Sequence, residues 1–173
     1  MKNNRKKYIR IVALSTNDNE PNISFNNNVK STIVWNYNIH YVSNNDKSPI
    51  SSKYNSILKD FSNSETIFVF CKDTTIFKTS NWGKILLDYF NKTEYGIIGI
   101  AGTTNIPESG CWWEDNTKTY GLNNYIDVNG NIYDKKFKGI KDVVMVSDVF
   151  FAVNPDNIEK SFDTDFNTYF SDV

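Results

Sequence analysis

The order of apolar patterns along the first hundred residues is the feature that most restricts how this chain can fold. Apolar runs of strand length alternate there with apolar stripes at helical spacing. The expected strands cover residues 8–14, 31–46, 66–71 and 95–102, and the expected helices cover residues 48–63 and a segment from about Ser80. Strands that alternate with helices are typical of a mostly parallel sheet covered on both faces. The sequence therefore predicts an α/β fold.

Two segments show the two periods most clearly. Within the segment 31–46, every second residue from Ile33 to Tyr41 is apolar or aromatic, as in a half-buried strand: Ile33, Trp35, Tyr37, Ile39 and Tyr41. The next segment has an apolar stripe at helical spacing: Ile50, Tyr54, Ile57, Leu58 and Phe61. The second helix is expected to bury a similar stripe: Trp82, Ile85, Leu86, Tyr89 and Phe90. The polar stretch NDNEPNISFNNN before these segments fits either a loop or a short helix.

The chain beyond residue 102 has a different pattern. Residues 103–121 are rich in turn residues and predict a long loop, and residues 123–134 predict a hairpin around Asn129-Gly130. Residues 142–155 predict a strand interrupted at Ser147-Asp148, and Pro155 begins a short helix. No internal repeat or linker is present, so we expect a single domain over residues 1–173.

The composition excludes several classes of function. The 19 basic and 20 acidic side chains give a net charge of −1, which provides no general attraction to nucleic acid or to an anionic membrane. The apolar run near the N-terminus is short and is broken by Arg10, and no segment approaches the roughly 20 apolar residues of a transmembrane helix. Cys71 and Cys111 have no metal-ligand spacing, and Cys71 is expected to be buried. We therefore expect a cytoplasmic protein.

Polar side chains follow three of the predicted strands. Ser15-Thr16 follows the first strand, Ser43-Asn44-Asn45-Asp46 the second, and Lys72-Asp73 the buried strand 66–71. Ligands of parallel α/β sheets bind at the carboxyl ends of the strands. These residues therefore predict one edge of the sheet that holds a polar ligand such as a nucleotide.

Other common enzyme classes lack their motifs in this chain. There is no P-loop and no GxGxxG motif, which argues against a kinase, a GTPase or a Rossmann dehydrogenase. The only histidine, His40, lies in the middle of a predicted strand, where a structural role is expected. A hydrolytic triad is therefore a poor fit.

Three stretches carry a family resemblance in a characteristic order: ISSKYNSILKDFSNSETIFVFCKDTTIF, YGIIGIAGTTNIPESGCWWED and VVMVSDVFFAVNPDNIEKSFDTDFNTYFSDV. Together they resemble the family 2-like glycosyltransferases of the GT-A fold, and more narrowly a small branch with a His-Asp-Asp or His-Gln-Asp strand end and a Gly-x-Trp-Trp motif. The resemblance covers residues 48–173 best. It implies a single GT-A domain with a mostly parallel sheet, flanking helices and a small antiparallel hairpin. Residues 1–102 would form its nucleotide-binding half and residues 103–173 its sugar or acceptor half.

The resemblance implies a nucleotide-sugar donor, with a UDP-sugar favoured, and Mn²⁺ or Mg²⁺ between its diphosphate and a carboxylate. Asp73 matches the metal-binding aspartate of the family, and hard cations prefer carboxylate oxygen. Cys71 and Lys72 stand where relatives usually have His and then Asp or Gln. Lys72 either neutralises a phosphate or weakens the metal site.

The remaining site residues also follow from the resemblance. It implies donor contacts from strand ends and from the helix 48–63: Ser15, Ser43, Asn44, Ser52 and Asn55. Trp112 and Trp113 would form a sugar or acceptor platform, or would fix their loop to the core. Asp148 would hold the sugar or an acceptor hydroxyl, and Asp172 would be the general base. Relatives continue beyond the position of Asp172, which leaves open whether this chain is part of a longer protein.

The function expected from these residues is metal-assisted transfer of a sugar to an unknown glycan or protein acceptor. One alternative is a catalytically impaired remnant that binds a nucleotide sugar or a glycan. Another is a carbohydrate-binding module that uses Trp112 and Trp113 without any nucleotide.

Overall fold

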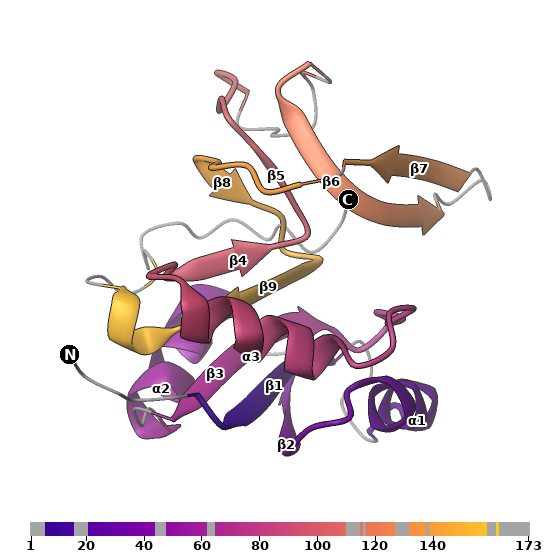
Figure 1. Cartoon of the computed structure of the whole chain (residues 1–173), viewed down its shortest axis with the longest axis vertical. Helices are drawn as coiled ribbons and strands as arrows, with labels where there is room; N and C mark the ends of the chain where they lie inside the picture. The colour runs from indigo at the N-terminus through magenta and orange to yellow at the C-terminus, as the bar shows by residue number, and fades with distance from the viewer. Residues whose placement is uncertain are drawn as a thin grey trace. The chain divides into compact units, whose positions relative to one another are not determined.

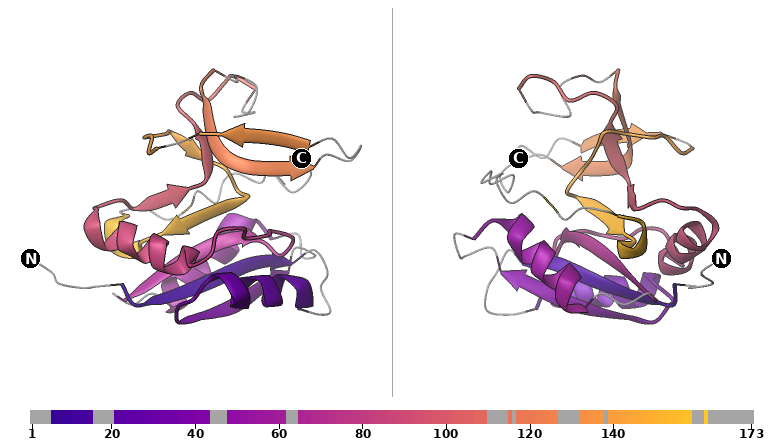
Figure 2. Two further views of the ribbon diagram at one scale, coloured as in Figure 1. Left: turned by 45° about the vertical axis from the view of Figure 1, so that its right-hand side comes forward. Right: turned by 90° about the vertical axis from the view of Figure 1, so that its left-hand side faces the viewer.

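The predicted α/β class is confirmed by the computed structural model, which describes residues 6–15, 21–43, 48–61, 65–109, 115, 117–126, 132–137, 139–158 and 162. These residues form a five-stranded sheet and a four-stranded sheet (Figures 1 and 2). The chain divides into two compact units. The first contains Met1–Ile97 and Ala152–Val173, and the second contains Ile98–Phe151.

The five-stranded sheet has the strand order β2-β1-β3-β9-β4. Its strands are β1 (Tyr8–Ser15), β2 (Tyr37–Ser43), β3 (Thr66–Lys72), β4 (Ile97–Gly99) and β9 (Phe150–Val153). β1 runs parallel to both of its neighbours, β2 and β3. Eight apolar residues of β1 and β3 are 0% exposed and form the centre of the core: Ile9, Ile11, Val12, Ala13, Ile67, Phe68, Val69 and Phe70. These buried runs are typical of parallel strands covered on both faces.

The helices are α1 (Ile23–Thr32), α2 (Ile50–Phe61), α3 (Trp82–Lys92) and the 3₁₀ helix η1 (Pro155–Asn157). Tyr54 of α2 packs on Phe70 of β3 with ring centroids 4.4 Å apart. Phe25 of α1 packs on Tyr41 of β2, which belongs to the opposite face of the sheet by the alternation of strand side chains. Gly83 of α3 approaches Ile9 on that same face so closely that an added Cβ would lie 3.1 Å from Cδ1 of Ile9. α2 therefore covers one face, and α1 and α3 cover the other (Figure 1).

The four-stranded sheet has the order β7-β6-β5-β8. Its strands are β5 (Ala101–Thr103), β6 (Thr119–Ile126), β7 (Ile132–Lys136) and β8 (Met145–Val146). β6 pairs antiparallel with both β5 and β7. The predicted hairpin is thereby confirmed as the β6–β7 pair, and its Asn129-Gly130 turn lies outside the described residues.

The prediction of a strand over residues 31–46 is wrong for its first part. Residues 31 and 32 end α1, and the strand β2 begins only at Tyr37. The N–H of Ile33 still donates to the helical carbonyl of Val29, and Val34 has a positive φ of 45° that turns the chain before the strand. The alternation of apolar residues begins at the end of α1, before the strand starts. A pattern of period two therefore did not reveal where the helix ends and the strand begins. The second half of the preceding polar stretch, from Ile23 on, forms the start of α1, so the helical alternative was correct.

The single strand predicted over residues 95–102 is divided into β4 and β5, which belong to different sheets. The chain bends at Ile100, whose side chain is 36% exposed. A Cβ on Gly102 would clash with the carbonyl oxygen of Met145, so a glycine is required for the close backbone approach there.

The predicted buried face of the second helix is partly wrong. Trp82, Leu86 and Phe90 are buried as expected, but Ile85 and Tyr89 are each 44% exposed. Leu87 is 2% exposed and takes their place in the core.

Candidate functional site

The carboxyl ends of β1, β2 and β3 meet at one edge of the sheet. Ser15 lies opposite Ser43 in the β1–β2 pair, and Leu14 lies opposite Lys72 in the β1–β3 pair. The backbone N–H of Asp73 donates to the carbonyl of Leu14 at 3.0 Å and extends this pairing by one residue. We call Ser15, Ser43, Lys72 and Asp73 the strand-end rim. Their predicted placement on one edge is confirmed.

Asp73 is the buried carboxylate of the strand-end rim. It is 2% exposed, and its Oδ2 accepts a hydrogen bond from Oγ of Ser15 at 3.3 Å. Its backbone carbonyl accepts a hydrogen bond from Nδ2 of Asn22 at 3.0 Å. Lys72 is half-buried and, by strand alternation, belongs to the face that α2 covers. The carboxylate and the adjacent lysine are therefore directed to opposite faces of the sheet.

The carboxylate of Asp73 influences two neighbouring groups. Burial, and next the charge of Asp73, raise the pKa of the Cys71 thiol and of the Tyr41 phenol above their usual values. Both groups are therefore protonated at neutral pH. The hydroxyl of Tyr41 donates to Oδ1 of Asn26 on α1 at 2.8 Å. This part of the rim carries negative charge on Asp73 and neutral polar groups around it.

The polar residues of α2 have different surroundings. The carboxamide of Asn55 binds the backbone of Phe162 in both directions: Nδ2 donates to its carbonyl and Oδ1 accepts from its N–H, each at 2.8 Å. Ser52 lies half-buried in the first turn, where its N–H donates to the carbonyl of Pro49. Lys53 donates from Nζ to the carbonyl of Ser43 at the end of β2. Asn55 thus has a structural partner, and its donor-binding role stays a prediction.

Asp148 lies in the turn between β8 and β9, in the part of the chain where the predicted strand is interrupted. Its side chain is exposed, so it carries no burial penalty. Ser147 is buried and shapes the turn: its N–H donates to the carbonyl of Ala101, and its Oγ accepts from the N–H of Val149 at 3.3 Å.

Comparison with known proteins supplies the family. The model of the "Glycosyltransferase like family" matches residues 15–173, which is most of the chain and begins at Ser15 of the strand-end rim. The chain belongs to this glycosyltransferase-like family. The family 2-like resemblance is thereby confirmed, and the family supports a function in glycosyl transfer. No curated protein and no solved structure matches the chain.

The side chains of the strand-end rim can be assessed as ligands for a divalent cation. Mg²⁺ takes oxygen ligands and often uses one or two carboxylates together with substrate phosphates, and Mn²⁺ suits similar ligands. Asp73 offers a carboxylate with the hydroxyl of Ser15 beside it. Among the described residues, no group of three or more His, Cys, Asp or Glu side chains is placed to hold a metal. The carboxylate of Asp73 and the hydroxyl of Ser15 are oxygen ligands that fit a hard cation whose other ligands come from phosphates. Because Asp73 is 2% exposed, such a ligand must displace the groups that cover it.

Several predicted site residues lie outside the described residues: Asn44, Trp112, Trp113 and Asp172. The structure adds three polar residues near the strand-end rim that were not predicted: Asn22, Asn26 and Lys53. Asn22 carried a signal in the sequence, because asparagine directly before a helix is a common N-cap. In the part of the chain that the structure describes, no helix is long and apolar enough to span a membrane.

Proposed function

We propose that this chain transfers a sugar from a nucleotide-diphosphate sugar, with a UDP-sugar favoured, to a glycan or protein acceptor. The observation that carries the proposal is the buried Asp73 carboxylate beside Ser15 at the carboxyl ends of adjacent parallel strands, in a chain of a glycosyltransferase-like family. This is the edge at which α/β sheets bind nucleotides.

The donor's diphosphate is proposed to bind beside Asp73. Mn²⁺ or Mg²⁺ held there by the carboxylate would offset negative charge on the leaving diphosphate. Lys72 would contribute a cationic ammonium group from the same strand end. Ser15, Ser43 and Asn44 would contact the nucleoside, with Ser52 and Asn55 of α2 nearby.

The reacting sugar and the acceptor are assigned to residues further along the chain. In the transfer step, an acceptor hydroxyl oxygen bonds to the anomeric carbon as the bond from that carbon to the diphosphate oxygen breaks. Asp172 would accept the hydroxyl proton as general base, and Asp148 would hydrogen-bond the sugar or the acceptor. Trp112 and Trp113 would offer aromatic faces to a sugar ring.

The donor-binding proposal is tested by titrating the full chain with UDP-sugars and GDP-sugars in the presence of Mn²⁺. A donor at 100 times its Kd should add about 2.7 kcal/mol to the free energy of unfolding. Asp73→Asn should abolish the Mn²⁺-dependent part of binding, because it removes the charged oxygen ligand. Asp88→Asn, which changes an exposed carboxylate of α3, serves as the control and should bind as the wild type does. Absence of binding by every donor would overturn the proposal.

A measurement of donor turnover distinguishes an enzyme from a remnant that only binds the donor. The remnant is the alternative suggested by Lys72, which departs from the family motif at its position. Donor hydrolysis or sugar transfer that disappears in Asp172→Asn supports the enzyme. Donor binding without either reaction supports the binding-only alternative.

A further inference from the structure

Asparagine side chains of the first helix hold the irregular segment from Asp73 to Phe77. Asn22, the N-cap of α1, donates from Nδ2 to the carbonyl of Asp73 at 3.0 Å. Asn28, in the middle of α1, binds the backbone of Phe77 in both directions: Nδ2 donates to its carbonyl at 3.0 Å, and Oδ1 accepts from its N–H at 2.7 Å. Both ends of the segment are therefore attached to one helix.

Asp73 itself is held through three of its groups. Its N–H donates to Leu14 on β1, its carbonyl accepts from Asn22 on α1, and its carboxylate accepts from Ser15 at the end of β1. The hydrogen bond from Asn22 fixes the peptide group that follows Asp73, and it thereby fixes the backbone from which the carboxylate projects at the strand-end rim.

The other end of the segment is held by packing as well as by Asn28. The ring of Phe77 stacks on Trp82 with centroids 4.4 Å apart and an interplanar angle of 10°. The ring of Phe77 also packs against that of Phe25 of α1, with centroids 6.2 Å apart. Nε1 of Trp82 donates a hydrogen bond to Oγ1 of Thr32. The segment is anchored even though it contains no helix or strand of its own.

We propose that Asn22 and Asn28 are positioning residues that hold Asp73 in the orientation required to bind a metal–diphosphate group. This inference rests on the proposed function. Groups that orient a metal ligand through hydrogen bonds typically change metal affinity by about 10- to 100-fold when they are mutated. Asn22 and Asn28 bind the backbone of Asp73 and Phe77, so their effect would act through the backbone of the segment.

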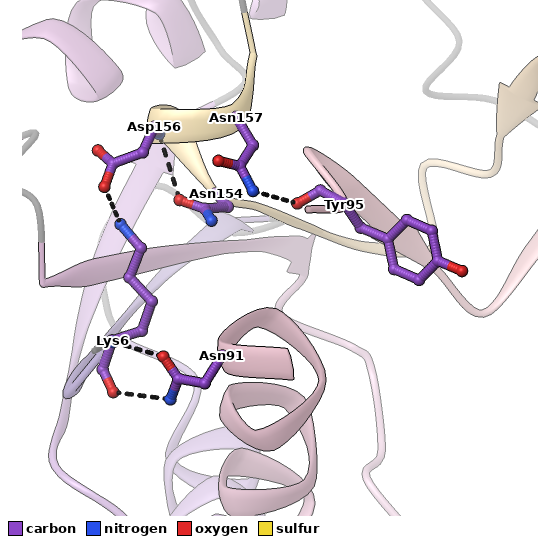
Figure 3. Close-up of polar contacts among 6 residues, drawn as sticks. All are labelled: Lys6, Asn91, Tyr95, Asn154, Asp156 and Asn157. Carbon is purple, nitrogen blue, oxygen red and sulfur yellow. Dashed lines mark hydrogen bonds and ion pairs between the residues drawn. The ribbon is translucent and has the colours of Figure 1, made fainter. Parts of the chain in front are cut away.

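The amino end of the same sheet provides matched controls (Figure 3). Asn154 is the N-cap of η1, and its Oδ1 accepts from the N–H of Asp156. Asn91 binds the backbone of Lys6 in both directions, as Asn28 binds Phe77. Lys6 precedes the first residue of β1, whereas Asp73 pairs near its last. At about 3.3 Å per residue the two ends of β1 are roughly 23 Å apart.

The first experiment compares Asn22→Ser with Asn154→Ser. Serine is as good an N-cap as asparagine, so each variant keeps its cap but loses the amide donor. The Kd of UDP is measured calorimetrically with and without Mn²⁺, together with the melting temperature. We expect Asn22→Ser to weaken Mn²⁺–UDP binding by about tenfold or more. Asn154→Ser should leave the Kd within about twofold of the wild-type value.

The second experiment compares Asn28→Ala with Asn91→Ala. Each variant removes a carboxamide that binds one residue's backbone twice, so both should lower the melting temperature. Only Asn28→Ala should also weaken Mn²⁺–UDP binding, which a purely structural role would not predict. If the wild type binds Mn²⁺–UDP and Asn22→Ser and Asn28→Ala bind it equally well, the inference is overturned and the proposed function stands. If the wild type binds neither UDP nor GDP in the presence of Mn²⁺, both the inference and the proposed function are overturned.

Discussion

His40 occupies a partly buried position beside a positive charge. It lies opposite Val12 in the β1–β2 pair, and Arg10 lies opposite Asn38, so Arg10 and His40 belong to the same face of the sheet. Burial, and next the charge of Arg10, lower the pKa of His40 below its usual value. The imidazole is therefore neutral at physiological pH.

The depressed pKa of His40 has a consequence for stability. As pH falls below about 6.5, the unfolded chain binds the proton before the folded chain does. The neutral imidazole therefore contributes to the free energy of unfolding above that pH, and this contribution is lost as pH falls toward the pKa of His40 in the folded state. Because the chain has one histidine, its NMR titration is directly assignable, and we expect a midpoint below about 6.5. His40→Gln should lose less stability than the wild type between pH 7 and pH 5. A midpoint at or above the usual value would contradict this.

At the scale of elements, α2 attaches a distant part of the chain to the sheet. Phe162 packs on Phe70 of β3 and on Tyr54 of α2, with ring centroids 5.7 and 5.9 Å apart. The next residue of α2, Asn55, binds the backbone of Phe162. Two adjacent helix residues thus contact the ring and the backbone of a single residue, which lies 107 positions beyond Asn55.

Replacing Asn55 tests this attachment. Asn55→Ala removes the partner of one backbone N–H and one carbonyl, and we expect it to lower the free energy of unfolding by about 1–3 kcal/mol. Urea denaturation measures the loss. Ser56→Ala is the neighbouring control: its hydroxyl bonds Asp60 at the surface, so a change within about 0.5 kcal/mol is expected.

The same variant also separates the two roles of Asn55. If Asn55 contacts the nucleoside as the family resemblance implies, the Kd of UDP should rise in Asn55→Ala by more than the stability loss explains. An unchanged Kd together with lower stability would assign the side chain to the attachment alone.

At the scale of the whole molecule, the first compact unit is assembled from two segments that are far apart in the chain. Nζ of Lys6 forms an ion pair with Asp156 at 2.9 Å across 150 residues, and Nδ2 of Asn157 donates to the carbonyl of Tyr95 (Figure 3). Residues 98–151 form the second unit between them. The ion pair therefore connects the start of the chain to the segment that returns from the second unit.

The asymmetric burial of this ion pair makes a prediction. The side chain of Lys6 is 3% exposed, whereas that of Asp156 is 40% exposed and keeps part of its hydration. Asp156→Asn removes the negative charge next to a buried ammonium and should cost roughly 1.5–3 kcal/mol. Lys6→Met keeps an apolar side chain of similar length and leaves a carboxylate that water still reaches, so a smaller loss is expected. Denaturant midpoints of the two variants provide the comparison, and a larger loss in Lys6→Met would refute it.

The α/β class, most of the element order and the strand-end rim could be predicted from the sequence alone. Hydrophobic period and strand order depend on residues near one another in the chain, and parallel strands necessarily bring their carboxyl ends together. The same local reading gave the family through the order of its motifs. The sequence-based boundaries were wrong where an apolar pattern continued across a bend of the backbone, as at Val34 and Ile100.

The contacts of the asparagine side chains, in contrast, are visible only in the three-dimensional fold. Asn22 is a candidate N-cap and Asn55 matches a family position, but the sequence does not indicate which backbone groups Asn22, Asn28, Asn55 and Asn91 bind. In the fold their carboxamides bind the backbones of Asp73, Phe77, Phe162 and Lys6. A carboxamide can donate and accept at once, so it can satisfy irregular backbone that lies outside helices and strands. Which backbone it meets depends on chain segments tens of residues away, and no local pattern in the sequence contains that information.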